Sequence, residues 1–125
     1  MANLHPGEDR GIRAFVAEAQ SLRGLMAHTL AVAEHAEAGG RLPGKLGTDH
    51  SMTELSSRYA LLMAEWMNET PEGMAGCVAM LELAGAIIAR RAAGLAPLSG
   101  LDQHVAVALV RLSKDRLAEL TEGEA

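Results

Sequence analysis

Residues 74–89 are the most hydrophobic stretch of the chain, and Glu82 is the only charged residue among them. A helix that is apolar on every face is buried on all sides in a globular protein. The stretch is shorter than the roughly 20 apolar residues that a membrane-spanning helix needs. The pattern therefore predicts the central helix of a small helical bundle and no membrane association.

Further segments repeat apolar residues at spacings of three and four, which is typical of amphipathic helices. Together with the central stretch, they predict an all-α fold, a four-helix bundle-like domain with an apolar third helix. We expect the helices at about 9–38, 51–69, 71–93 and 99–120, in a single domain that spans residues 1–125.

Several residues have the chemistry that marks helix ends. Ser51 with Glu54 has the spacing of a capping box, in which two orphan backbone donors are satisfied reciprocally. Ser99 and Asp102 repeat that spacing before the last segment. Gly94 predicts the end of the apolar helix, because glycine readily adopts the left-handed conformation that follows many helices.

Residues 39–50 form the longest predicted loop, which we expect either to cross the bundle or to bind a partner. Its first residues nearly match the phosphate-binding pattern G-x-x-x-x-G-K-[ST], but Leu46 replaces the Ser or Thr. That motif also requires a preceding strand, and a helix precedes this loop. The match is therefore interpreted as chance, and the function left for Arg41 and Lys45 is weak anion binding.

The composition restricts what the core can contain. The chain has 125 residues, of which 49% are hydrophobic, but its only aromatic residues are Phe15, Tyr59 and Trp66. The core must therefore consist mainly of aliphatic side chains and methionine, which fills irregular gaps. The lone cysteine, Cys77, excludes a disulfide within the chain and is expected to be a buried, unreactive thiol.

The net charge is −5, and the basic residues are scattered along the sequence. A nucleic-acid-binding protein normally carries a basic stripe, so we expect no nucleic-acid partner. Residues 1–9 lack the apolar segment of a secretory signal. These features favour a cytoplasmic location.

Glu82 is the first candidate for chemistry, because its helical projection lies among alanines that would let a neighbouring helix approach closely. A buried carboxylate needs a partner or water, since burying an unpaired charge is costly. We therefore expect Glu82 to meet an arginine or a hydroxyl, from this chain or a second copy, or to lie at a dimer seam that stays wet. The alternative is a ligand site around Glu82, with Trp66 and Tyr59 as its wall.

His28 and His35 lie on the polar side of the first predicted helix, seven residues and therefore about 10 Å apart. One metal ion cannot bind both, because its bonds to histidine nitrogen are about 2 Å long. The sequence also contains no Glu-x-x-His or His-Glu-x-x-His pattern. We expect no metal and no cofactor.

The segment Ala27-His28-Thr29-Leu30 resembles the phosphoacceptor segment of histidine phosphotransfer domains, which are also small helical bundles. The family pattern places Lys and Gly three and four residues after the histidine, where this chain has Ala31 and Val32. The resemblance covers four residues and implies phosphotransfer through His28 as a remote alternative.

No catalytic constellation is recognisable in the sequence, which favours a non-enzymatic role. The first hypothesis is a small soluble protein-interaction or regulatory module, such as an adaptor, inhibitor or immunity-like protein. Because three amphipathic helices need not cover the whole of the apolar third helix, we expect a second copy to cover the remainder in a homodimer. The second hypothesis is a small-molecule or enzymatic site in the helical core around Glu82.

Overall fold

The computed structural model describes the backbone of residues 8–38 and 43–124, and the side chains of residues 8–35 and 51–122. The described chain contains four α-helices: α1 (Arg10–Ala38), α2 (Pro43–Trp66), α3 (Met74–Ala92) and α4 (Asp102–Glu124). The helices pack together, and no strand is present in these ranges. The predicted all-α fold with four helices is confirmed.

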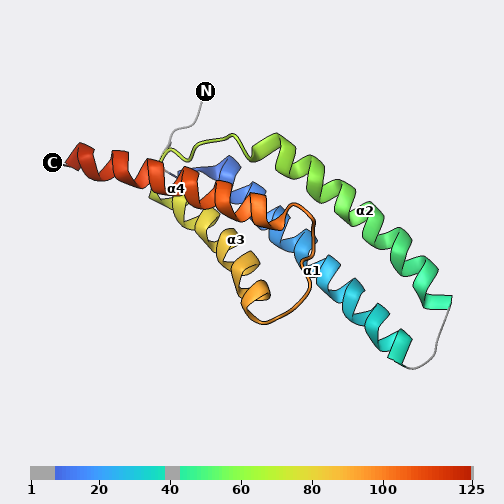
Figure 1. Cartoon of the computed structure of the whole chain (residues 1–125). Helices are drawn as coiled ribbons and strands as arrows, with labels where there is room; N and C mark the ends of the chain where they lie inside the picture. Colours follow the sequence, from blue (N-terminus) through green and yellow to red (C-terminus); the bar gives the residue numbers. More distant parts are fainter. Residues whose placement is uncertain (1–7, 39–42, 125) are drawn as a thin grey trace.

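The helices form two pairs of unequal length. The helices α1 and α2 form a long antiparallel hairpin, and α3 packs against both α1 and α4. Figure 1 shows that α3 and α4 lie beside the first half of α1, while the α1–α2 hairpin continues beyond them. As a result α3 has helices on one side only, and the expectation that this apolar helix is buried on all sides is wrong: Met74, Val78, Leu81 and Ile88 are exposed.

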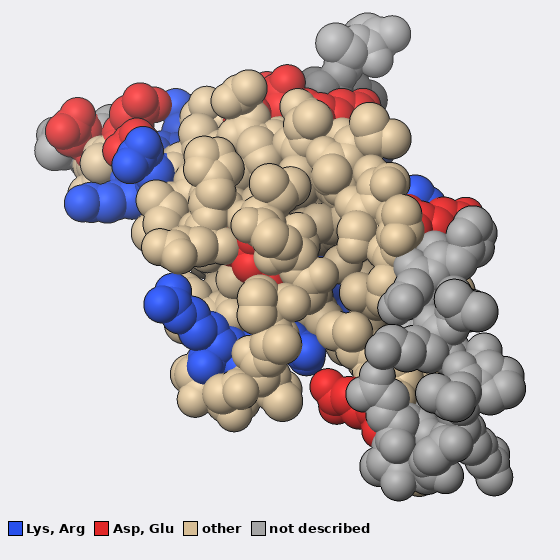
Figure 2. All heavy atoms as spheres, turned by 45° about the vertical axis from the view of Figure 1, so that its right-hand side comes forward, with Lys and Arg blue, Asp and Glu red and all other residues tan. Residues whose placement is uncertain are grey.

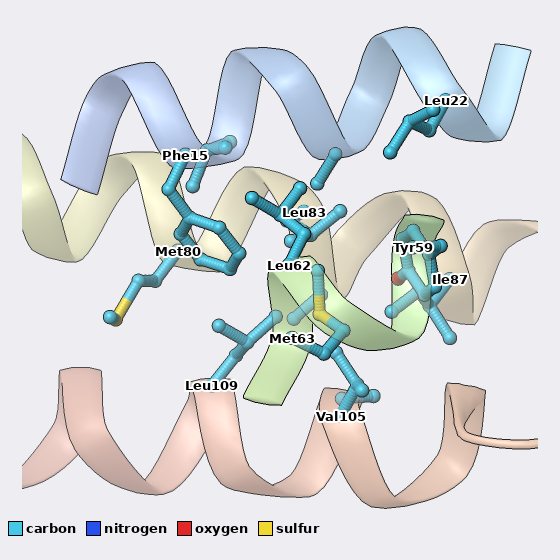
Figure 3. Packing of buried hydrophobic residues seen from close by; sticks show 14 of the residues in the cluster. Phe15, Leu22, Tyr59, Leu62, Met63, Met80, Leu83, Ile87, Val105 and Leu109 are labelled. Carbon is cyan, nitrogen blue, oxygen red and sulfur yellow. The ribbon is translucent and has the colours of Figure 1, made fainter. Parts of the chain in front are cut away.

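The core lies where the first half of α1 and the second half of α2 meet α3 and α4. Figure 3 shows side chains of all four helices converging there, including Phe15, Met63, Leu83 and Leu109. Apart from Phe15 and Tyr59, the buried cluster consists of aliphatic side chains and methionines. The predicted core composition is therefore confirmed.

The predicted start of the second helix is wrong. The helix α2 begins at Pro43, so most of the expected 39–50 loop is helical and the expected capping box at Ser51 lies inside the helix. Proline suits the first position of a helix, because its missing N–H has no intrahelical partner there. Gly44 and Gly47 suggested a loop, but each costs only about 1 kcal/mol relative to alanine. Figure 1 shows that the first turns of α2 run beside the second half of α1.

The end of α3 agrees with the prediction at Gly94. Its φ of 77° is in the left-handed region, and its N–H donates to the Arg91 carbonyl at 3.0 Å. The Leu95 N–H donates to the Arg90 carbonyl at 3.2 Å. These two bonds form a Schellman motif, which satisfies carbonyls that have no intrahelical donor.

The start of α3 is capped by a residue distant in sequence, Asp9. The Asp9 carboxylate accepts hydrogen bonds from the backbone N–H groups of Glu72 at 2.7 Å, and of Gly73 and Gly76 at 2.9 Å. A side chain at Gly76 would collide with this carboxylate. Gly76 must therefore be a glycine, because only then can Asp9, which directly precedes α1, reach the positive end of the α3 dipole.

A buried ion pair joins α1 to the start of α4. Arg23 Nη1 donates to Asp102 Oδ1 at 2.7 Å, and the two side chains are only 5% and 8% exposed. The other Asp102 oxygen accepts the Leu98 backbone N–H at 3.2 Å. Asp102 therefore serves mainly as the partner of Arg23 rather than as a member of the expected capping box with Ser99.

Candidate functional site

Glu82 is exposed, so the expectation that it is buried within the chain is wrong, whereas a partner from a second copy stays a prediction. No hydrogen bond or ion pair joins its side chain to any described residue. The physical reason is the arrangement of the bundle: α1 and α4 cover one side of α3, and Glu82 projects from the opposite side. Alanines adjoin Glu82 on α3, but no neighbouring helix packs against the side of α3 from which Glu82 projects.

Tyr59 is fully buried in the core rather than lining a cavity around Glu82. Its hydroxyl accepts a hydrogen bond from Arg23 Nη1 at 3.5 Å, and the guanidinium carbon lies 5.9 Å from the ring centroid. Burial raises the pKa of Tyr59, and the nearby Arg23 charge offsets part of that rise. Tyr59 thus belongs to the buried cluster that includes the Arg23–Asp102 pair.

Trp66 is half-buried at the end of α2, where it packs against α1. Its ring stacks on Phe15, with centroids 5.8 Å apart and an interplanar angle of 12°. A Cβ atom at Gly11 would lie only 2.9 Å from the indole ring, so the glycine makes room for it. No described contact joins Trp66 or Tyr59 to Glu82, and ligand binding by these three residues stays a prediction.

The other candidates are placed as follows. Arg41 and the side chain of Lys45 lie outside the described residues, and their anion binding stays a prediction. His28 and His35 are exposed on α1. Within residues 8–35 and 51–122, no group of three or more His, Cys, Asp or Glu side chains could hold a metal ion. None of the described helices is both long enough and apolar enough to span a membrane.

Cys77 is buried and carries a free thiol, as predicted. Its Sγ lies 3.8 Å from the Ser113 carbonyl oxygen, and the Ser113 hydroxyl donates to the Cys77 carbonyl at 3.4 Å. Burial, and secondarily the Asp9 carboxylate, raise the pKa of the Cys77 thiol. A neutral buried thiol is a poor nucleophile, so this pair of residues serves to join α3 and α4.

The outward side of α3 carries an apolar stripe, which we call the outer stripe. Its positions are spaced alternately by four and three residues, and comprise Met74, Val78, Leu81, Gly85, Ile88 and Ala92. All six are exposed, with Leu81 at 38% and Ile88 at 54% of their maximum. Spacing of this kind is the a/d seam of a helix that pairs with another helix.

A groove of about 950 Å³ lies beside the outer stripe, between the end of α3 and the first half of α4. Ile88 borders both features, and the groove also contains Leu95, Val107 and Val110, which are exposed apolar side chains. Figure 2 shows a face of the molecule on which uncharged side chains cover most of the described surface.

The groove is basic although the whole chain is acidic. Four of the chain's eleven Lys and Arg side chains line it, namely Arg90, Arg91, Arg111 and Lys114. Arg90 Nε donates to the Ala96 carbonyl, whereas the other three make no side-chain hydrogen bond or ion pair with described residues. Of the two acidic residues in the lining, Asp102 is already paired with Arg23.

Sequence reasoning missed both the groove and the buried ion pair. Arg23 lies among apolar positions of the first predicted helix, between Leu22 and Met26, and an arginine there signals a buried partner. The groove has no such signal, because Arg90 and Arg111 lie on different helices whose relative placement is a tertiary property.

Comparison with known protein families, with curated proteins and with solved structures finds no match to this chain.

Proposed function

We propose that this protein is a protein-interaction module that works as a homodimer, with the outer stripes of two α3 helices packed against each other. The observation that carries the proposal is the exposed a/d pattern of the stripe over the whole of α3. Monomeric proteins rarely expose large contiguous apolar patches, and such patches mark interaction sites.

A second copy is the partner that the stripe fits best, because the stripe itself carries no charge. Two identical surfaces meet in a two-fold dimer, so a charged stripe would meet a like charge in its partner. Glu82 lies at the margin of the stripe, where its carboxylate can stay in water. Nothing lies within 4 Å of a Cβ atom built on Gly85, so a second helix has room to approach there.

Regulatory or adaptor modules of this kind work through their surface, and the well-packed core is consistent with such a role. The acidic balance of the chain is consistent with the proposed cytoplasmic location.

Sedimentation equilibrium of the whole chain tests the proposal. Wild-type protein is expected to sediment as a dimer at micromolar concentration, and Leu81→Glu as a folded monomer, because a carboxylate would be buried at the seam. The matched control is Leu61→Glu, which introduces the same charge at a 73% exposed leucine of α2. A monomeric wild type, or equal association of both variants, would contradict the proposal.

A further inference from the structure

The α3–α4 groove is elongated along α4. Its lining on that helix extends from Asp102 to Asp115, a distance of about 20 Å at 1.5 Å per residue. The exposed apolar side chains of Leu95, Val107 and Val110 lie along this length. A groove of that length accommodates about three to four turns of a helix.

The charges of the groove come from both of its helices. Arg90 and Arg91 lie on α3, whereas Arg111 and Lys114 lie on α4. A ligand with one anionic headgroup and an apolar tail would engage cations at one end and leave the others unpaired. A ligand with several anionic groups, distributed along an apolar surface, would pair with all four cations.

We propose that the groove binds an acidic amphipathic helix of a partner protein. The apolar face of that helix would cover Leu95, Val107 and Val110, and its Asp or Glu side chains would pair with the cations on either side. This is the helix-in-groove mode of recognition, in which apolar residues at i, i+3, i+4 and i+7 are the anchors. The basic groove in an otherwise acidic protein also steers an acidic partner to this surface.

This inference is independent of homodimerisation, and Ile88 is the one residue that borders both surfaces. Variants that test the groove therefore leave Ile88 unchanged. The Leu81→Glu variant is expected to lose dimerisation and keep groove binding, whereas a groove variant is expected to do the reverse.

The probe is a fluorescent helical peptide of about 18 residues, or five turns, with leucine at i, i+3, i+4 and i+7, glutamate at the margins of that face and alanine elsewhere. Three comparison probes are a scrambled peptide of the same composition, a peptide with lysine in place of glutamate, and dodecanoate. Fluorescence anisotropy measures peptide binding to the full chain at low and physiological salt, and isothermal titration calorimetry measures dodecanoate binding. We expect saturable binding of the amphipathic acidic peptide alone, weakened by salt because its ion pairs lie at the surface.

The decisive variant is Arg111→Glu with Lys114→Glu, which reverses the charge of the α4 side of the groove. We expect it to weaken peptide binding by at least about tenfold, since like charges then face each other. The control is Arg58→Glu, an exposed arginine of α2 that likewise makes no side-chain hydrogen bond or ion pair with the described residues and lies outside the groove. The affinity of Arg58→Glu for the acidic peptide should be within about twofold of the wild-type affinity. The comparison is corrected for the smaller change of net charge in this single variant.

Circular dichroism verifies that each variant is folded, and Val107→Asp supplies a second test if the double variant unfolds. Absence of binding by the acidic peptide would overturn the proposal. So would equal binding of the scrambled or lysine peptide, or equal losses in the double variant and in Arg58→Glu. Binding of dodecanoate in place of the peptide would assign the groove to a small amphiphile and would also overturn it.

Discussion

The two sides of α3 have similar composition but opposite surroundings. The inner side, with Cys77, Met80, Leu83 and Ile87, is buried in the core. The outer side includes Leu81 and Ile88, which are as apolar as their buried neighbours and yet exposed. The hydrophobic effect depends on area removed from water, so only the inner side stabilises the fold of a single chain. The outer side is available for binding.

Ile87 and Ile88 show the contrast at adjacent positions, because one is 6% exposed and the other is 54% exposed. Consecutive helical residues point about 100° apart, so a helix that packs on one side separates them. The following predictions compare the inner and outer sides, beginning with the largest expected effect on stability.

The Arg23–Asp102 ion pair is buried between α1 and the start of α4. Arg23→Met should lower the free energy of unfolding by about 3–5 kcal/mol, because it leaves Asp102 buried without its partner. Urea denaturation measures the change. The double variant Arg23→Met with Asp102→Leu should recover much of the loss, and a single variant as stable as wild type would show that the pair does not hold the helices.

Leu83→Ala and Leu81→Ala compare the two sides directly with the same chemical change. Leu83 is completely buried, and its truncation should cost about 2–5 kcal/mol through lost burial and the cavity left behind. In monomeric protein, Leu81→Ala should change stability by no more than about 0.5 kcal/mol, as is usual at exposed positions. Chemical denaturation at low protein concentration gives both values. Equal losses of stability in the two variants would contradict the distinction between a buried inner side and an exposed outer side.

The Asp9 cap fixes the start of α3 and hence the orientation of both sides. Asp9→Ala should cost about 1–3 kcal/mol, because three backbone N–H groups lose their acceptor in a largely buried site. Hydrogen exchange should then accelerate most at Gly73 and Gly76. Unchanged protection at these amides would show that the cap is dispensable.

Raising the pH should lower the free energy of unfolding through two buried groups, by less than the substitutions above. The folded state raises the pKa of Cys77 and Tyr59 above their ordinary values of 9.0 and 10.0. Their contribution is therefore complete below about pH 9 and is lost as the pH rises through the folded pKa values, since unfolding then releases protons. Urea melts between pH 8 and pH 11 should show this loss, with a shallower slope in Cys77→Ala and in Tyr59→Phe. The same slope in all three proteins would contradict it.

Sequence patterns predicted the helices well because apolar periodicity and the Gly94 stop are local properties. They failed at Pro43, where the helix continues through two glycines that suggested a loop, and at Glu82, where they could not indicate which side of α3 would be covered. The Asp9 cap and the cations of the groove depend on contacts between distant segments. The candidate site could therefore be located only from the three-dimensional arrangement. The sequence did predict that part of the third helix is left uncovered.

The most direct test of the account detects contacts between two copies across the outer stripe. A mixture of ¹³C-labelled and unlabelled protein, studied by isotope-filtered nuclear Overhauser spectroscopy, reports only contacts between different molecules. We predict cross-peaks that connect the methyl groups of Val78, Leu81 and Ile88 with the unlabelled copy, and none from Leu61 on α2. Intermolecular contacts at Leu61 instead, or a dimer without any contact at these three methyl-bearing residues, would contradict the central claim.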